Sequence, residues 1–168
     1  MPLHEYHFSE RWLVPANACE VWDVLADAKL LPDWWRGVYL ECVALGDVRE
    51  PRVGDRFRAL ARGALPYRLR FTLETAALER PRLVMVKVSG DLNGTWQATL
   101  CQKPDGTRVE LEQHVLADKP LLRFFSPLLK PLFAWNHRWT TPRGQAGLTA
   151  FLAERGKLQT CRSAETGS

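Results

Sequence analysis

The segment Leu132–Leu148, LFAWNHRWTTPRGQAGL, combines residue types that could do chemistry with residue types that usually form a core. His137 could act as a general base, and the two tryptophans could line an apolar ligand site. At about 100° per helical residue, Trp135 and Trp139 share one face with Leu132, whereas His137 falls nearly opposite. We therefore expect no catalytic role for His137. Both tryptophans should face the interior, where they either line a cavity or pack in the core.

Two amides lie near this expected interior. Asn136 stands at the border of the helical stripe, so it is either an amide at the edge of a pocket or an ordinary surface residue. Gln113 shares the inward phase of its strand with Val109, Leu111 and Val115. A buried amide needs hydrogen-bond partners. Gln113 is therefore either satisfied by a neighbour or by solvent, or it orients a ligand.

No other group of residues indicates catalysis or metal binding. The cysteines, which are Cys19, Cys42, Cys101 and Cys161, are widely spaced, and no histidine stands at a zinc-type spacing from them. The sequence has no glycine-rich phosphate loop and no nucleophile motif. His114 falls on the outward phase of its strand. We expect no catalytic residue, no metal and no cofactor, and reduced cysteines in a cytoplasmic protein.

Periodicity predicts the elements that position these residues. Residues 4–15 alternate as a first strand, and Asn17 with Glu20 forms a capping-box pattern that opens a short helix. Residues 28–37 form a second short helix or turn. The period then changes to two over six strands with short links, which predicts antiparallel meander pairing. In LPYRLRFTLET, Tyr67, Leu69 and Phe71 face one way and the arginines face the other.

A continuous apolar stripe then predicts one long C-terminal helix. Its members are spaced by three or four residues and are Leu121, Phe125, Leu128, Leu132, Trp135 and Trp139. Pro127, Pro131 and Pro142 should bend or break this helix. Only this helix can cover the apolar face of the sheet, and a curved sheet around one helix leaves a cavity suited to apolar ligands.

Composition narrows the class of protein. The 168 residues carry a net charge of +4 and are 46% hydrophobic, which fits a single globular domain. We expect no membrane span and no signal peptide. Arg56, Arg58, Arg68 and Arg70 form a basic face without the interleaved aromatics of a nucleic-acid surface. We therefore expect this face to be solvated and to bind no nucleic acid.

Several segments in order resemble one known superfamily. They are VPANACEVWDVLAD, WWRGV, VGDRFR, LPYRLRF, GDLNGTWQATL, DGTRVELEQHV and WNHRW…GQAGL, within roughly residues 5–152. Together they are similar to the polyketide cyclase/dehydrase and lipid-transport group of the START/Bet v 1-like (SRPBCC) superfamily. The resemblance implies an α+β helix-grip fold, with a seven-stranded curved antiparallel sheet wrapped around a long C-terminal helix and two short helices after the first strand. Two positions depart from it, because relatives tend to carry an aromatic residue at Gln113 and often continue the last helix through Pro142.

We therefore expect one helix-grip domain over residues 1–155, a flexible tail over residues 156–168, and binding or transport of a small hydrophobic molecule. The residues expected to contact this ligand are Tyr67, Leu69, Phe71, Trp96, Gln113, Leu132, Trp135, Asn136 and Trp139. One alternative is a polyketide cyclase or dehydratase, although the inward strand positions offer almost no acid or base. Another alternative is a protein-binding module that uses the arginine face. The oligomeric state is left open.

Overall fold

The part of the chain that the structure describes forms one edge strand, a short helical segment, six further strands and a long helix. The computed structural model describes residues 5–63, 68–116 and 126–165, and within the last helix the side chains of residues 134, 135 and 138–157. The elements in chain order are β1 (Glu5–Val14), α1 (Ala18–Ala26), η1 (Ala28–Leu30), α2 (Leu31–Trp34), β2 (Tyr39–Ala44), β3 (Arg56–Arg62), β4 (Arg68–Glu79), β5 (Leu83–Gly90), β6 (Asn93–Lys103), β7 (Gly106–Leu116) and α4 (Ser126–Glu165).

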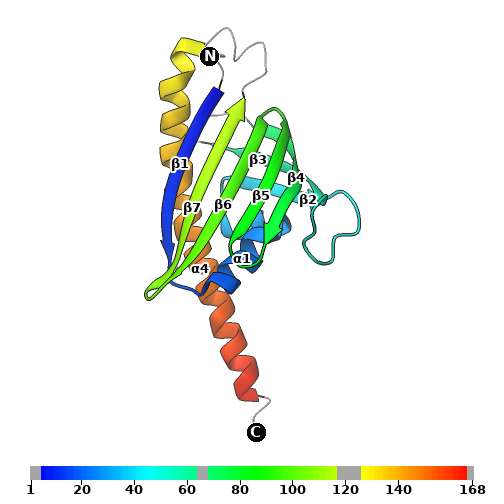
Figure 1. Cartoon of the computed structure of the whole chain (residues 1–168), viewed down its shortest axis with the longest axis vertical. Helices are drawn as coiled ribbons and strands as arrows, with labels where there is room; N and C mark the ends of the chain where they lie inside the picture. The colour runs from blue at the N-terminus through cyan, green and yellow to red at the C-terminus, as the bar shows by residue number, and fades with distance from the viewer. Residues whose placement is uncertain (1–4, 64–67, 117–125, 166–168) are drawn as a thin grey trace.

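All seven strands belong to one antiparallel sheet. Their order is β1-β7-β6-β5-β4-β3-β2, so β2 to β7 form the predicted meander and β1 adds to β7 at the edge. In the β1–β7 pair, His7 lies opposite His114 and Trp12 lies opposite Val109. Figure 1 shows the sheet wrapped across α4, with β1 along one edge. The predicted helix-grip architecture is confirmed.

Each strand buries one face and exposes the other, in the phases that the alternation predicted. Phe57, Phe71 and Leu73 are buried, whereas Arg58 and Arg70 are exposed. Antiparallel sheets commonly show this division, because one face packs on a core and the other meets water. The inward phase therefore supplies the apolar surface on which α4 and the short helices pack.

Local hydrogen bonds fix α1 at one end of the sheet. The amide of Glu20 donates to Asn17 Oδ1 at 3.0 Å, and the amide of Asn17 donates to the Glu20 carboxylate at 3.4 Å, which confirms the predicted capping box. Gln102 on β6 accepts a hydrogen bond of 2.8 Å from the first amide of α1. Trp22 Nε1 donates to the carbonyl of Leu83 on β5 at 2.9 Å. These contacts hold α1 against β5 and β6.

The continuity of helix α4 bears on the expectation that its prolines bend or break it. It runs from Ser126 to Glu165 as one helix through Pro131 and Pro142, so the prolines do not break it. It also continues beyond residue 156, and its far end projects past the sheet in Figure 1. The backbone of residues 156–165 is therefore helical, while the domain limit at residue 155 stays a prediction.

Side-chain hydrogen bonds support the backbone of α4 near Pro142. Trp35 Nε1 donates to the carbonyl of Thr140 at 3.0 Å, and Arg143 Nη1 donates to the carbonyl of Trp139 at 2.7 Å. The missing proline amide in a helix interior costs about 3 kcal/mol. Packing of the following helical turns against the short helices offsets this cost.

Two glycines set the separation between α4 and the residues it covers. A Cβ atom on Gly147 would overlap the carbonyl oxygen of Trp34, and one on Gly144 would lie 2.7 Å from the rings of Trp12 and Trp35. Leu148 beside them is fully buried. The GQAGL segment therefore forms the close contact between α4 and α2, because no larger side chain fits there.

The buried side chains of the described residues form two large clusters and a small third one around Tyr6 and Val115. The first includes Trp12, Val21, Trp34 and Leu148 and joins the sheet to α1, α2 and α4. The second is centred on Tyr39, Phe57, Phe71 and Leu73. Trp35 packs against both clusters. No helix among the described residues is long and apolar enough to cross a membrane.

Candidate ligand-binding cavity

A chain of aromatic rings crosses the interior from α2 to β6. Trp34 stacks on Trp35 with ring centroids 5.2 Å apart, and Trp35 contacts Tyr39 at 5.4 Å. Tyr39 meets Phe71 edge-on at 6.4 Å, and Phe71 meets Trp96 edge-on at 5.4 Å. Such edge-to-face and offset arrangements stabilise aromatic pairs beyond their area burial. The rings form a continuous wall inside the molecule.

A cavity of about 90 Å³ adjoins this wall, between the sheet and the helices. Leu73 and Val84 are among the aliphatic residues that line it, and Trp12, Trp34, Trp35, Tyr39 and Trp96 line it as well. Gln113 contributes an amide side chain to the lining, whereas Gln97 borders the cavity with its side chain on the outer face, bonded to Thr99. The cavity therefore lies at the junction of the two buried clusters and offers mainly apolar surface.

A second cavity of about 100 Å³ lies on the β2–β4 side of the same wall. Leu69, Phe71, Arg62 and Thr140 contribute to its lining. Both cavities are lined by the same four side chains, which are Trp35, Tyr39, Trp96 and Gln113. The two cavities therefore adjoin each other across these shared residues.

The tryptophans around the first cavity carry unused hydrogen-bond donors. Nε1 of Trp12, Trp34 and Trp96 is buried and has no acceptor in the part of the chain that the structure describes. Trp35 differs, because its Nε1 bonds the carbonyl of Thr140. An unsatisfied buried donor costs about 1–3 kcal/mol. An acceptor oxygen on a bound molecule would remove this cost if movement of the neighbouring side chains opened these buried nitrogens to the cavity.

Tyr39 is the only ionisable side chain that lines the first cavity within the described ranges. Burial raises the pKa of its phenol far above the ordinary value, and repulsion from Cys42 adds to the effect. The pKa of the neighbouring Cys42 thiol is itself raised to about 12, mainly by burial and further by Asp27 and Glu41. Tyr39 therefore stays protonated near neutral pH, where it can donate a hydrogen bond but cannot serve as a base.

The structure brings part of the predicted ligand-contacting set together. Leu69, Phe71, Trp96 and Gln113 all line the second cavity, and Trp96 and Gln113 also line the first. Trp139 is half-buried and packs against the second cluster, with the guanidinium of Arg143 3.8 Å from its ring centroid. The side chains of Tyr67, Leu132 and Asn136 lie outside the described residues.

Trp135 departs from its predicted orientation toward the sheet, because 51% of its surface is exposed. The buried positions of α4 are Thr141, Gly144 and Leu148, which follow each other by three and four residues. At about 100° per residue, Trp135 lies roughly 120–180° from these positions. The glycine contact therefore turns a different face of α4 toward the interior than the tryptophan stripe suggested.

The sequence prediction missed Trp12, Trp34, Trp35 and Tyr39 as cavity residues. Trp34 ends α2, Trp35 follows it and Tyr39 begins β2, so the three lie where Pro32 interrupts the helical pattern and the period of the next strand has only begun. The paired tryptophans in WWRGV were visible, but as part of a resemblance rather than as a site. Contact between the two tryptophans and the α4 glycines is the feature that reveals their position.

A groove of about 300 Å³ on the surface between α2 and α4 has a different character. It is lined by side chains of both charges, including Asp33, Arg36, Arg143 and Glu154. Opposite charges in water neutralise each other there and contribute little binding energy. The interior cavities combine apolar walls with buried, unpartnered donors, so they are the better candidate site.

Comparisons with known proteins identify the same architecture elsewhere. The family described as "Polyketide cyclase / dehydrase and lipid transport" matches residues 6–148. The Zhui aromatase/cyclase from Streptomyces sp. R1128 has a TM-score of 0.73 at 13% identity, covering 90% of this chain and 96% of that one. A protein from Thermus thermophilus has a TM-score of 0.72 at 17% identity, covering 90% of this chain and 98% of that one.

A point mutant of norcoclaurine synthase from Thalictrum flavum is similar at a TM-score of 0.60 and 16% identity, covering 90% of this chain and 96% of that one. No curated protein sequence matches the chain significantly. At these identities, the structural similarities establish the fold, while function has to be argued from the cavity itself.

Proposed function

Because the chain belongs to the polyketide cyclase/dehydrase and lipid-transport family, we propose that it binds and carries a small, largely apolar molecule bearing an oxygen acceptor. The cavities beside the aromatic wall are the binding site in this proposal. The observation that carries it is the set of buried indole donors on Trp12, Trp34 and Trp96 without acceptors among the described residues. An apolar cavity with a few polar groups is the usual form of a small-molecule site.

The apolar walls supply the affinity in this proposal. Burial of apolar surface contributes about 25 cal/mol per Å², and flat aromatic side chains favour a flat ligand. The wall formed by Trp35, Tyr39, Phe71 and Trp96 offers ring faces and ring edges for such contacts. A planar or polycyclic ligand fits this surface better than a branched one.

The polar groups supply orientation. The indole N–H groups and the protonated Tyr39 phenol are donors, and Gln113 can both donate and accept. A ketone, quinone or carboxyl oxygen would satisfy such donors, whereas a pure hydrocarbon would leave them unpaired. Because the site combines apolar walls with hydrogen-bond donors, we infer that the ligand is an aromatic or lipid-like molecule with one or more carbonyl oxygens.

The size of the cavities sets a condition on binding. Each measures about 90 or 100 Å³, whereas sites for drug-sized ligands usually measure about 300–1,000 Å³. A larger ligand therefore requires the shared residues, above all Trp96 and Gln113, to move and join the two spaces. Helix α4 can stay in place during this change, because the shared wall lies between the cavities.

The test compares two flat probes that differ in one carbonyl group, fluorenone and fluorene. Saturable changes in tryptophan fluorescence report binding of each compound. We expect fluorenone to bind about 2–10-fold more tightly, since one net hydrogen bond is worth about 0.5–1.5 kcal/mol. Trp96→Phe keeps the ring and removes one donor, so this variant should reduce the preference for the ketone.

Trp22→Phe is the matched control for this test. The Nε1 donor of Trp22 is already bonded to the Leu83 carbonyl, and neither cavity has Trp22 in its lining. The control should keep the preference for the ketone. Equal affinity of the parent protein for the two probes, or no saturable binding of either, would contradict the proposal.

A cyclase or dehydratase is the second candidate, favoured by the fold shared with the Zhui aromatase/cyclase. Such a reaction needs an acid or a base at the substrate, and in the described lining of the cavities the titratable groups are Tyr39 and Arg62. Incubation with a poly-β-ketone and mass spectrometry of dehydrated products tests this function. Turnover that disappears in Tyr39→Phe while binding persists would favour the enzyme over the carrier.

A further inference from the structure

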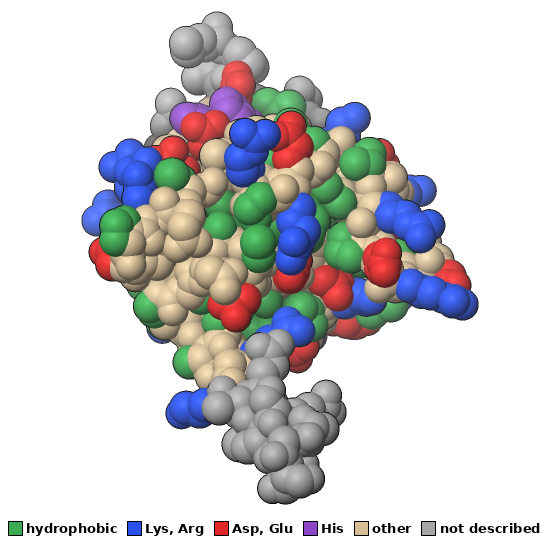
Figure 2. Space-filling model, turned by 60° about the horizontal axis from the view of Figure 1, so that its bottom comes forward, with side chains coloured by type: hydrophobic (Ala, Val, Ile, Leu, Met, Phe, Trp, Pro, Cys, Tyr) green, Lys and Arg blue, Asp and Glu red, His purple; other side chains and the backbone are tan. Residues whose placement is uncertain are grey.

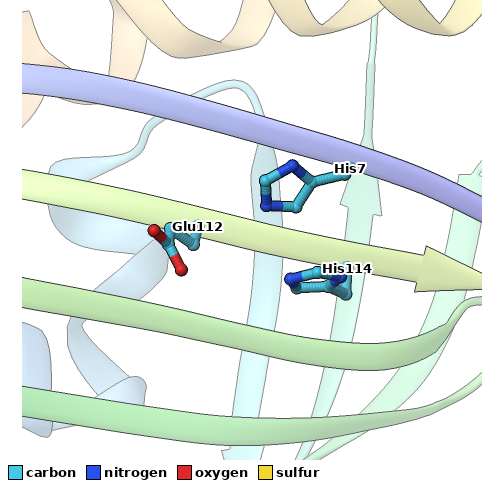
Figure 3. Close-up of side chains that lie close together, drawn as sticks. All are labelled: His7, Glu112 and His114. Atoms are coloured by element: carbon cyan, nitrogen blue, oxygen red, sulfur yellow. The ribbon is translucent and has the colours of Figure 1, made fainter.

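Two histidines and a glutamate meet on the outer face of the sheet, away from the cavities. His7 on β1 and His114 on β7 are direct partners in the antiparallel register, with ring centroids 4.3 Å apart. Glu112 lies two residues before His114 and therefore on the same face of β7. Figure 3 shows the two imidazoles side by side with the Glu112 carboxylate next to them. One ligand atom from each residue lies within 4.8 Å of the others.

The surroundings leave this group of three accessible. All three side chains are exposed, and Figure 2 shows histidine side chains beside acidic ones on the surface. Ser9 is the register partner of Glu112 on β1 and lies two residues from His7 on the same face. Its side chain is small. On the other side of β7, Thr95 and Gln97 lie opposite His114 and Glu112. None of these neighbours would block an ion.

The neighbouring ion pairs leave the Glu112 carboxylate available. The arginines next along this face, Arg11 and Arg108, are both engaged with Glu110, at 3.3 and 3.4 Å. Glu112 makes no ion pair with any residue that the structure describes, so its carboxylate is available. A free carboxylate beside two imidazoles is the donor set of several zinc sites with three protein ligands.

We propose that His7, Glu112 and His114 bind one divalent transition-metal ion of the Zn²⁺ class. Imidazole nitrogens suit Zn²⁺, Cu²⁺ and Ni²⁺ better than Mg²⁺ or Ca²⁺, which prefer sites built from oxygen ligands. Bonds of about 2.0–2.1 Å to one ion require only rotations of exposed side chains that already lie together. Three protein ligands leave a further coordination position open to water or to another ligand.

The ion would connect β1 and β7 at one edge of the sheet. β1 is an edge strand and pairs only with β7, so a metal held by His7 and His114 would fasten the edge strand to its neighbour. The sequence predicted no metal site because His7 and His114 are far apart along the chain, and only the strand register brings them together. The site is independent of the cavity and of the ligand proposed for it.

Calorimetric titration of the untagged, chelator-treated protein with Zn²⁺ tests the proposal, with thermal unfolding as a second readout. We expect one Zn²⁺ per chain and a higher Tm in the presence of Zn²⁺ but not of Mg²⁺, since a ligand that binds only the folded state stabilises it. His7→Asn, Glu112→Gln and His114→Asn should each weaken Zn²⁺ binding by about tenfold or more, because even changes beyond the direct ligands cost about 10–100-fold.

Cys101→Ser is the matched control, because it removes an exposed metal-binding side chain outside the group of three. This variant should keep the affinity and the Tm shift of the parent protein. The metal-free Tm of every variant shows whether it folds, and resonances of both imidazoles that shift together on adding Zn²⁺ provide a readout that does not depend on variants. The proposal is overturned if the parent binds no Zn²⁺ saturably, or if both histidine variants bind Zn²⁺ as tightly as the parent.

Discussion

At the scale of single residues, burial decides how the ionisable groups near the cavity behave. Tyr39 and Cys42 both lie within the second cluster, and both keep their protons over the neutral range because their charged forms would lose hydration. This leaves the cavity with hydrogen-bond donors and without a described base. These protonated groups therefore suit recognition of a ligand's acceptor oxygen better than abstraction of a proton from it.

The first prediction concerns the reactivity of Cys42. Its pKa of about 12 leaves almost no thiolate at pH 8, and thiolate is the reactive form. We expect iodoacetamide to modify the exposed Cys101 in the folded protein and to leave Cys42 unmodified, as peptide mass spectrometry would show. In denaturant both should react. Equal labelling of the two cysteines in the folded state would contradict the burial of Cys42.

At the scale of elements, the contact of α4 with α2 determines which helix face meets the interior. Gly144 and Gly147 allow the helix backbone to approach Trp34 and Trp35, and Leu148 completes this face. Close approach through small residues fixes both the distance and the rotation of a helix. The exposed position of Trp135 follows from this rotation.

The second prediction tests this contact by Gly147→Ala. The added Cβ would overlap the Trp34 carbonyl, so we expect a loss of about 1–3 kcal/mol in the free energy of unfolding, as for other overpacked sites. Gly156→Ala is the matched control in the same helix, because nothing lies within 4 Å of its added Cβ. The control should gain about 0.5–1 kcal/mol from helix propensity. Urea midpoints that change alike in both variants would show that the glycine contact is not tight.

The buried and exposed faces of an element were predictable from the sequence where a single regular hydrophobic period determines them. Alternation placed Phe71 inward and Arg70 outward, because a strand with one buried face fixes its own phase. For α4, periodicity gave the relative positions of Trp135 and Trp139 but not the rotation of the helix, which depends on contact with α2. The cavity wall around Trp35 follows from tertiary packing of a segment without a clear period. The pairing of His7 with His114 depends on long-range register.

At the scale of the whole molecule, the sheet separates most arginines of β3 and β4 from the binding site. Arg56, Arg58 and Arg70 lie on the outer face, where Arg56 pairs with Glu74 at 3.8 Å, whereas Arg62 at the end of β3 contributes to the lining of the second cavity. The cavities lie on the other face, toward α4. The binding of an apolar ligand should therefore depend little on this basic face.

The third prediction follows from this separation. Joint replacement of Arg58 and Arg70 by glutamine should change the free energy of unfolding by no more than about 0.5 kcal/mol, as is usual for exposed positions. Binding of the fluorenone probe should also stay the same. A urea titration and a probe titration of the double variant measure both quantities. A large loss of probe binding would mean that the basic face takes part in recognition.

The pairing of β1 with β7 also has a consequence for synthesis of the chain. The partner of the N-terminal strand is made of residues 106–116, so β1 leaves the ribosome long before its hydrogen-bonding neighbour exists. At about 5–20 residues per second, roughly 5–20 s pass between the two events. During that time Trp12 and Val14, which are buried in the finished protein, have no sheet to cover them. Until β7 is made, the apolar side chains of β1 therefore lack their final protection from water.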